Sequence, residues 1–208
     1  LDVTRHGRIY RLVPDAGKVF ERPRMLDQSS SELVAYLDHE NGWWRDQAQM
    51  QIVLRGDDSV IPALKKMARS GKSDNARINA LWTLEGLGQV NAKLVLSALN
   101  HESSRVQLTG VRLSEPSLKE GNSAISKAIN DHLAQDKSDP QLVIQIYNSF
   151  GKVGTKQSIA QQKAIFRSNE DHPIFVGLAN AEKAKEERAA LSATSKRGQT
   201  VYKSICMT

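Results

Sequence analysis

Few residues of this 208-residue chain have the type and spacing that chemistry at a site requires. The single cysteine, Cys206, excludes an internal disulfide framework and a zinc site built from several thiolates. No serine stands in a nucleophile-elbow motif. The five histidines show no spacing typical of metal ligation; they are His6, His39, His101, His132 and His172. We therefore expect neither a metal site nor catalytic residues in this chain.

The three tryptophans are the other side chains that invite a functional interpretation. Trp43 and Trp44 are adjacent, and Trp82 stands alone. Tryptophans could relay electrons or anchor a partner protein. On paired helices they more often fill the space between the helices, so we favour packing for these residues.

The net charge of +6 is confined to the two ends of the chain. Residues 1–24 carry six basic and three acidic side chains, residues 181–208 carry the same numbers, and residues 25–180 are neutral overall. A nucleic-acid-binding domain concentrates Lys and Arg on its folded body, where they neutralise phosphates. We therefore predict no nucleic-acid partner. No window approaches about 18 uninterrupted apolar residues, so we also expect no membrane span.

The elements that must position these residues follow a repeating helical pattern from Ser29 onward. Pairs of helical segments are expected at 33–37 and 44–54, 60–67 and 76–84, 94–99 and 106–113, 124–133 and 142–150, and 159–166 and 174–181. The second segments begin at the equivalent residues Trp44, Ala76, Val106 and Leu142, which are 32, 30 and 36 residues apart. Four positions later stand Ala48, Ala80, Gly110 and Ile146, mostly small residues that let paired helices approach. This period predicts an all-α fold, an α-solenoid of about four or five HEAT-like or armadillo-like hairpins.

Two arginines, Arg45 and Arg77, recur at one position of this repeat. They could line a charged groove that binds a ligand. They could also form a ladder of ion pairs between repeats that fixes the stacking angle. We favour the ladder.

The ends of the chain differ from the repeats. Residues 8–13 alternate between polar and apolar side chains and predict a short strand, either a loose N-terminal arm or the last strand of an upstream sheet. Residues 182–191 favour a helix, either the last of the solenoid or a semi-rigid spacer. We therefore divide the chain into an arm or the end of an upstream domain (1–24), the solenoid (25–191), and a linker that leads into a further domain (192–208).

The last residues, from Gly198 to Thr208, resemble the opening of a class I cytochrome c domain. In that family a glycine, an apolar residue and an aromatic residue precede a Cys-x-x-Cys-His haem site. The resemblance implies that Val201, Tyr202 and Ile205 face the haem and that Cys206 is the first thioether cysteine. The alternative is an ordinary cysteine near the end of the chain.

A second resemblance covers most of the chain. Residues 37–48 are similar to the run L-x-H-x-N-G-W-W-R-D-x-A of large bacterial membrane-bound dehydrogenase-like proteins, and residues 80–88 to their run A-L-W-T-L-x-G-L. Residues 7–11 resemble the strand that ends their propeller. Those proteins join a sorbosone/glucose-dehydrogenase-type β-propeller, HEAT repeats and a C-terminal cytochrome c.

The resemblance implies that this chain is a segment of a longer, exported or periplasmic redox protein. Its expected role is a non-catalytic scaffold between a propeller of the quinoprotein dehydrogenase type and a haem c acceptor, so a quinone cofactor is expected in the propeller of the parent protein. The segment itself is expected to hold no cofactor. The alternative is a protein-interaction module that binds a partner on the concave solenoid face. A contiguous apolar or like-charged concave groove would favour the second function, and a mixed one the first.

Overall fold

The computed structural model describes residues 23–135 and 139–206, with side chains as far as residue 192 and at residues 194 and 196. In these ranges the chain is all-α, with helices and no strand, which confirms the predicted fold class. The arm expected at residues 1–24 lies almost wholly outside the described residues.

Six helices form three consecutive hairpins. They are α1 (Ser30–Tyr36) with α2 (Gly42–Arg55), α3 (Ile61–Ser70) with α4 (Asp74–Gly86), and α5 (Ala92–Leu99) with α6 (Ser104–Leu113). Short 3₁₀ turns, η1 (Met25–Asp27) and η2 (Asp58–Val60), precede α1 and α3. The remaining helices are α7 (Glu115–Lys119), α8 (Ser123–Leu133), α9 (Pro140–Val153), α10 (Lys156–Ser168) and α11 (Pro173–Cys206).

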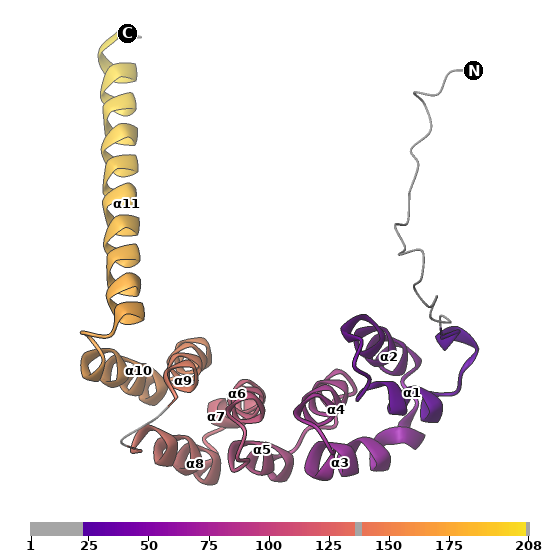
Figure 1. Ribbon diagram of the computed structural model, residues 1–208. Helices are drawn as coiled ribbons and strands as arrows, with labels where there is room; N and C mark the ends of the chain where they lie inside the picture. Colours follow the sequence, from indigo (N-terminus) through magenta and orange to yellow (C-terminus); the bar gives the residue numbers. More distant parts are fainter. Residues whose placement is uncertain (1–22, 136–138, 207–208) are drawn as a thin grey trace, which may run out of the picture.

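The hairpins stack into an arc with two rows of helices (Figure 1). Helices α2, α4, α6 and α9 pack in sequence along the concave side, and α3, α5 and α8 pack along the convex side. Helix α11 leaves the C-terminal end of the arc on the side toward which the concave face opens. The second helices of the repeats, whose first residues align in the sequence, therefore form one surface.

Side-chain caps start the helices, and a glycine in the left-handed backbone conformation ends α2. Ser29 and Glu32 form a reciprocal capping box at α1, and the Asn41 side chain caps α2 through the backbone N–H of Trp43. Gly56 ends α2 with a φ of 59°, a conformation that costs a glycine little. Residues 41 and 42, which lie between the expected segments 33–37 and 44–54, thus form the start of a helix.

A continuous core runs through the stack from Met25 to Phe175. Each hairpin contributes side chains that are almost fully buried, among them Ile52, Leu64 and Leu99. One hairpin alone could not enclose these side chains, because it has one apolar face and no partner for it. Stacking supplies that partner.

The fourth hairpin differs from the prediction. Helix α8 packs on α5 and α7, whereas α9 packs on α6, α7 and α10, so that α7 contacts both helices of the expected fourth hairpin. The sequence pattern did not predict α7, because five residues are too few to show a helical period. Pro116 in its first turn allows the helix to start directly after α6.

The C-terminal helix α11 has no break where residues 191 and 192 were expected to divide two segments. It runs for 34 residues, which corresponds to a length of about 51 Å. Phe175 anchors its base, with ring centroids 5.3 Å from Tyr147 and 5.9 Å from Phe166. Every residue from 181 to 192 is exposed.

Candidate interaction surface

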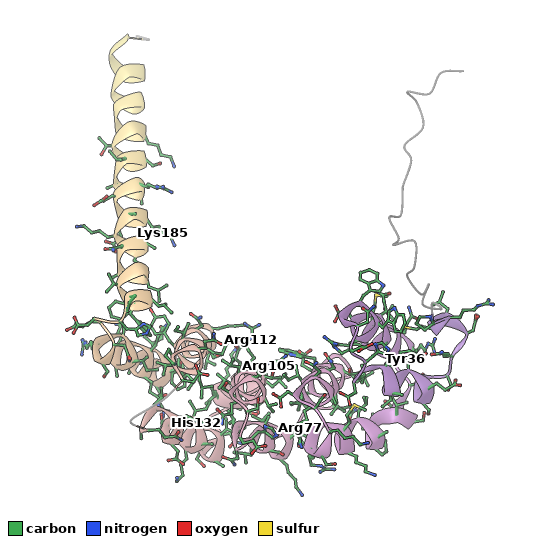
Figure 2. The ribbon with its side chains drawn as sticks, in the orientation of Figure 1. Tyr36, Arg77, Arg105, Arg112, His132 and Lys185 are labelled. Carbon is green, nitrogen blue, oxygen red and sulfur yellow. The ribbon has the colours of Figure 1, made fainter. Side chains whose placement is uncertain are left out.

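The concave face brings equivalent positions of successive repeats together. Met50 in α2 corresponds to Trp82 in α4 and to Arg112 in α6, since each lies six residues after the aligned start of its helix. Arg112 is labelled in Figure 2. Two neighbouring grooves contain these positions, and they share Trp82 and Glu85 as a common wall.

The first groove lies between α2 and α4 and has a volume of about 400 Å³. Its lining residues are Asp46, Gln49, Met50, Val53, Leu54, Trp82, Glu85 and Gly86. A Cβ atom on Gly86 would stand 2.8 Å from Cγ2 of Val53, so the two helices touch at the groove floor. Leu54 is 74% exposed and Met50 42% exposed. This groove is therefore apolar, with two carboxylates and no cation among its described lining residues.

The second groove is bounded by α4, α6, α7 and α9 and has a volume of about 470 Å³. Its charged lining residues are Glu85, Arg112, Glu115, Lys119 and Lys152. Cations and carboxylates alternate here, in contrast to the first groove. The concave face as a whole is therefore mixed in charge and is not one continuous apolar surface.

Glu115 is the buried charge of the second groove. Its carboxylate lies 2.6 Å from Nζ of Lys152 and 3.8 Å from Nε of Arg112. Ser149 Oγ donates a hydrogen bond to Oε1 of Glu115 at 3.0 Å, and Gln145 Nε2 donates to Ser149. These contacts tie α7 to α9. The helical period does not predict these contacts, because Glu115 and Ser149 are 34 residues apart in the chain.

The three tryptophans lie in different surroundings. Trp44 packs against the core, with its ring centroid 4.4 Å from His39 and 6.4 Å from Tyr36. Trp82 also packs against the core and forms the wall between the grooves. Trp43 differs from the packing interpretation, since its side chain is 68% exposed.

The two recurring arginines act within their own hairpins, so the structure corrects the expected ladder between repeats. Arg45 Nη1 donates hydrogen bonds to the carbonyls of His39 and Glu40, at 2.6 and 2.9 Å. Arg77 Nη1 donates to the carbonyl of Arg69 in the same way. Both side chains reach back from the fourth residue of a second helix to the end of the first helix or its turn. Arg77 thereby satisfies a carbonyl in the last turn of α3, and Arg45 satisfies two carbonyls of the turn between α1 and α2.

Contacts between repeats come instead from caps and backbone carbonyls. Ser73 Oγ, the N-cap of α4, donates to Asp38 of the previous hairpin, and Ser103 Oγ donates to Asp74 at 2.5 Å. Asn79 Nδ2 donates to the carbonyl of Leu37 at 2.8 Å. These bonds repeat along the stack and fix one hairpin against the next.

Cys206 lies in the last turn of α11, and its side chain is outside the described residues. Across residues 23–135 and 139–206 no group of three or more His, Cys, Asp or Glu side chains could hold a metal ion. No helix in the same ranges is long and apolar enough to cross a membrane.

Among the described residues, the pKa values of Glu32, Asp57 and Tyr147 are shifted, and none of these three side chains lines either groove. Hydrogen bonds from Ser29 lower the pKa of Glu32, and hydrogen bonds from Ser59 lower that of Asp57. Burial raises the pKa of Tyr147, with a smaller contribution from the charge of Glu182. The two carboxylates act at helix starts, a structural role, so these shifts do not indicate a catalytic centre.

Comparisons with protein-family models, with curated proteins and with solved structures give no match to this chain.

Proposed function

We propose that this chain is a non-catalytic spacer in a larger redox protein. It would hold an upstream propeller of the sorbosone/glucose-dehydrogenase type at a fixed distance from a downstream cytochrome c. The proposal takes its modules from the resemblances at residues 7–11, 37–48, 80–88 and 198–208. It implies an exported parent with haem c and, in the propeller, a quinone cofactor.

The observation that carries the proposal is the unbroken helix from Pro173 to Cys206. Its base is clamped by an aromatic cluster around Phe175, and the exposed part continues the same backbone without a glycine-rich or proline-rich joint. A helical connection transmits position and orientation, whereas a flexible linker transmits only a maximum distance. The mixed charge of the concave face also favours a spacer over a docking face that extends the length of the arc.

A haem c site requires two thiols and an axial ligand. This chain contains one cysteine, so Cys206 would contribute to such a site only together with residues of the downstream domain. We expect Cys-His directly after Thr208 in the native gene. The 208-residue segment purified alone from a host that matures cytochromes should show no covalent haem band.

The test of the spacer uses the full-length gene product. Reduction of its haem by the sugar or alcohol substrate should slow at least tenfold, on the order of 1.4 kcal/mol in the barrier, when Gly-Gly-Ser-Gly is inserted after Asn180. The same insertion in the turn at Gly121, which leaves α11 intact and follows α7, serves as the control for added length. An unchanged rate after the Asn180 insertion would contradict a rigid spacer.

A further inference from the structure

The groove between α2 and α4 has features that a spacer does not need. Met50 and Leu54 are large exposed apolar side chains of the same helix, and both line the groove beside Trp82. Exposed apolar side chains gathered in a groove are typical of a binding surface.

We propose that this groove binds a basic amphipathic helix of a partner protein. Apolar side chains of the partner would lie between Leu54 and Trp82. Its Lys and Arg side chains would face the carboxylates of Asp46 and Glu85. The proposal goes beyond the spacer function and does not depend on it.

The charge of the groove selects this partner. Asp46 and Glu85 are both exposed, and no cation is present among the groove's described lining residues. Cationic side chains of a partner that pair with these carboxylates across a partly desolvated surface raise the affinity of the complex and speed its association. A nucleic acid is disfavoured, because its phosphates would meet these carboxylates.

The neighbouring groove fixes where the partner lies. Arg112, Lys119 and Lys152 line the part of the concave face next to Trp82. A basic segment placed there would meet cations of the same sign, which raises the free energy of the misplaced complex. The partner therefore covers α2 and α4 and stops before α6.

The shape of the site suits a helix. α2 and α4 are neighbours in the inner row, and Val53 against Gly86 forms a floor at which the helices touch. On a partner helix, residues at positions i, i+3, i+4 and i+7 form an apolar stripe that fits such a groove, with the polar face left at the rim. Met50 and Leu54, one turn apart on α2, form one wall.

The test uses two synthetic 18-residue helical peptides as probes. One has a Leu stripe and a Lys face, and the other has the same Leu stripe with Glu in place of every Lys. Isothermal titration calorimetry on the intact 208-residue chain should show the Leu/Lys peptide binding at least about tenfold more tightly than the Leu/Glu peptide. Equal affinities, or no binding of either peptide, would overturn the proposal.

Variants locate the binding. Leu54→Ser should weaken binding of the Leu/Lys peptide about tenfold, and because Leu54 is 74% exposed, the fold should tolerate the change. Leu26→Ser, at a leucine that is 77% exposed outside the groove, is the matched control and should leave the affinity unchanged. A larger loss for Leu26→Ser than for Leu54→Ser would place the peptide elsewhere and refute the assignment.

The charge argument has its own variant. The pair Asp46→Asn and Glu85→Gln should reduce the affinity and flatten its dependence on salt, because both counter-charges are removed. Glu102→Gln, at an exposed carboxylate in the turn before α6, should change neither. An unchanged salt dependence in the double variant would show that these carboxylates do not face the peptide, contrary to the proposal.

Discussion

Gly110 of α6 lies directly against Ala98 of α5. A Cβ atom on the glycine would stand 3.1 Å from the Cβ of Ala98 and 2.9 Å from the backbone nitrogen of Leu99. Backbone atoms cannot move aside as a flexible side chain can. The equivalent positions in α2 and α4 are the fully buried Ala48 and Ala80. Small residues at this position therefore set how closely the two helices of each hairpin approach.

We expect Gly110→Ala to destabilise the stack by roughly 1–3 kcal/mol, the usual cost of overpacking, in spite of the better helix propensity of alanine. Urea unfolding monitored by circular dichroism measures this change in the free energy of unfolding. Gly177→Ala in α11 is the control, because a Cβ there meets nothing within 4 Å. That variant should be neutral or more stable by up to about 1 kcal/mol. Equal changes in both variants would rule out the close approach as the cause.

The arginine contacts within hairpins predict a selective loss. Arg45→Met removes two hydrogen bonds to the carbonyls of His39 and Glu40 and should lower the free energy of unfolding by about 1–2 kcal/mol. Arg45→Lys should recover only part of this loss, since one ammonium lacks the guanidinium's fixed fork.

Arg24→Met is the control for the loss of an arginine. Its ion pair with Asp27 joins side chains that are 86% and 59% exposed, so this change should cost less than about 0.5 kcal/mol. A cost for Arg24→Met that matches the cost for Arg45→Met would show that the loss comes from charge in general.

The stacked hairpins could be predicted because local and global signals agree. Turn formers separate the apolar segments, and the equivalent positions Trp44, Ala76 and Val106 all lie near the starts of second helices. Asn41 and Ser73, which lie between the expected helical segments, are the N-caps of α2 and α4. Helical period and capping depend on residues that are close in sequence, so both can be recognised from the sequence alone.

The grooves could not be predicted in the same way. The expected segment 44–54 contains both Ile52 and Leu54, yet two residues span about 200° around a helix, and Leu54 is exposed while Ile52 is buried. Applying the repeat spacing to Met50 would have aligned it with Trp82 and Arg112 and indicated the concave face. The contact of Glu115 with Ser149 depends on α7, which has no periodic signal.

The buried carboxylate of Glu115 predicts an asymmetry between its partners. Lys152→Met should destabilise the chain by about 1–3 kcal/mol, because it leaves a buried carboxylate without its closest cation. Glu115→Gln should cost less, since Lys152 is 62% exposed and can be solvated when the carboxylate is removed. Urea unfolding of both variants measures the difference, with Lys127→Met as the control at a lysine that is 75% exposed. A greater cost for Glu115→Gln would contradict this account.

The capping box of α1 predicts a dependence of stability on pH. Hydrogen bonds from the Ser29 side chain and backbone lower the pKa of Glu32 below its ordinary value of 4.5. Because the pKa is lower in the folded chain than in the unfolded chain, Glu32 stabilises the fold at pH values above 4.5. This stabilisation is lost as the pH falls through the lowered pKa. Glu32→Gln removes the titrating group.

The difference in free energy of unfolding between the native chain and Glu32→Gln should therefore be constant near neutral pH and shrink in acid. Titration of the Glu32 carboxyl carbon by NMR gives the pKa directly, and Ser29→Ala should raise that pKa toward 4.5. Ser31→Ala, at an exposed serine inside the first turn that does not take part in the capping box, should leave it unchanged. The account fails if Ser29→Ala and Ser31→Ala give the same Glu32 titration curve, because the serine hydroxyl at the N-cap would then have no part in holding the carboxylate ionised.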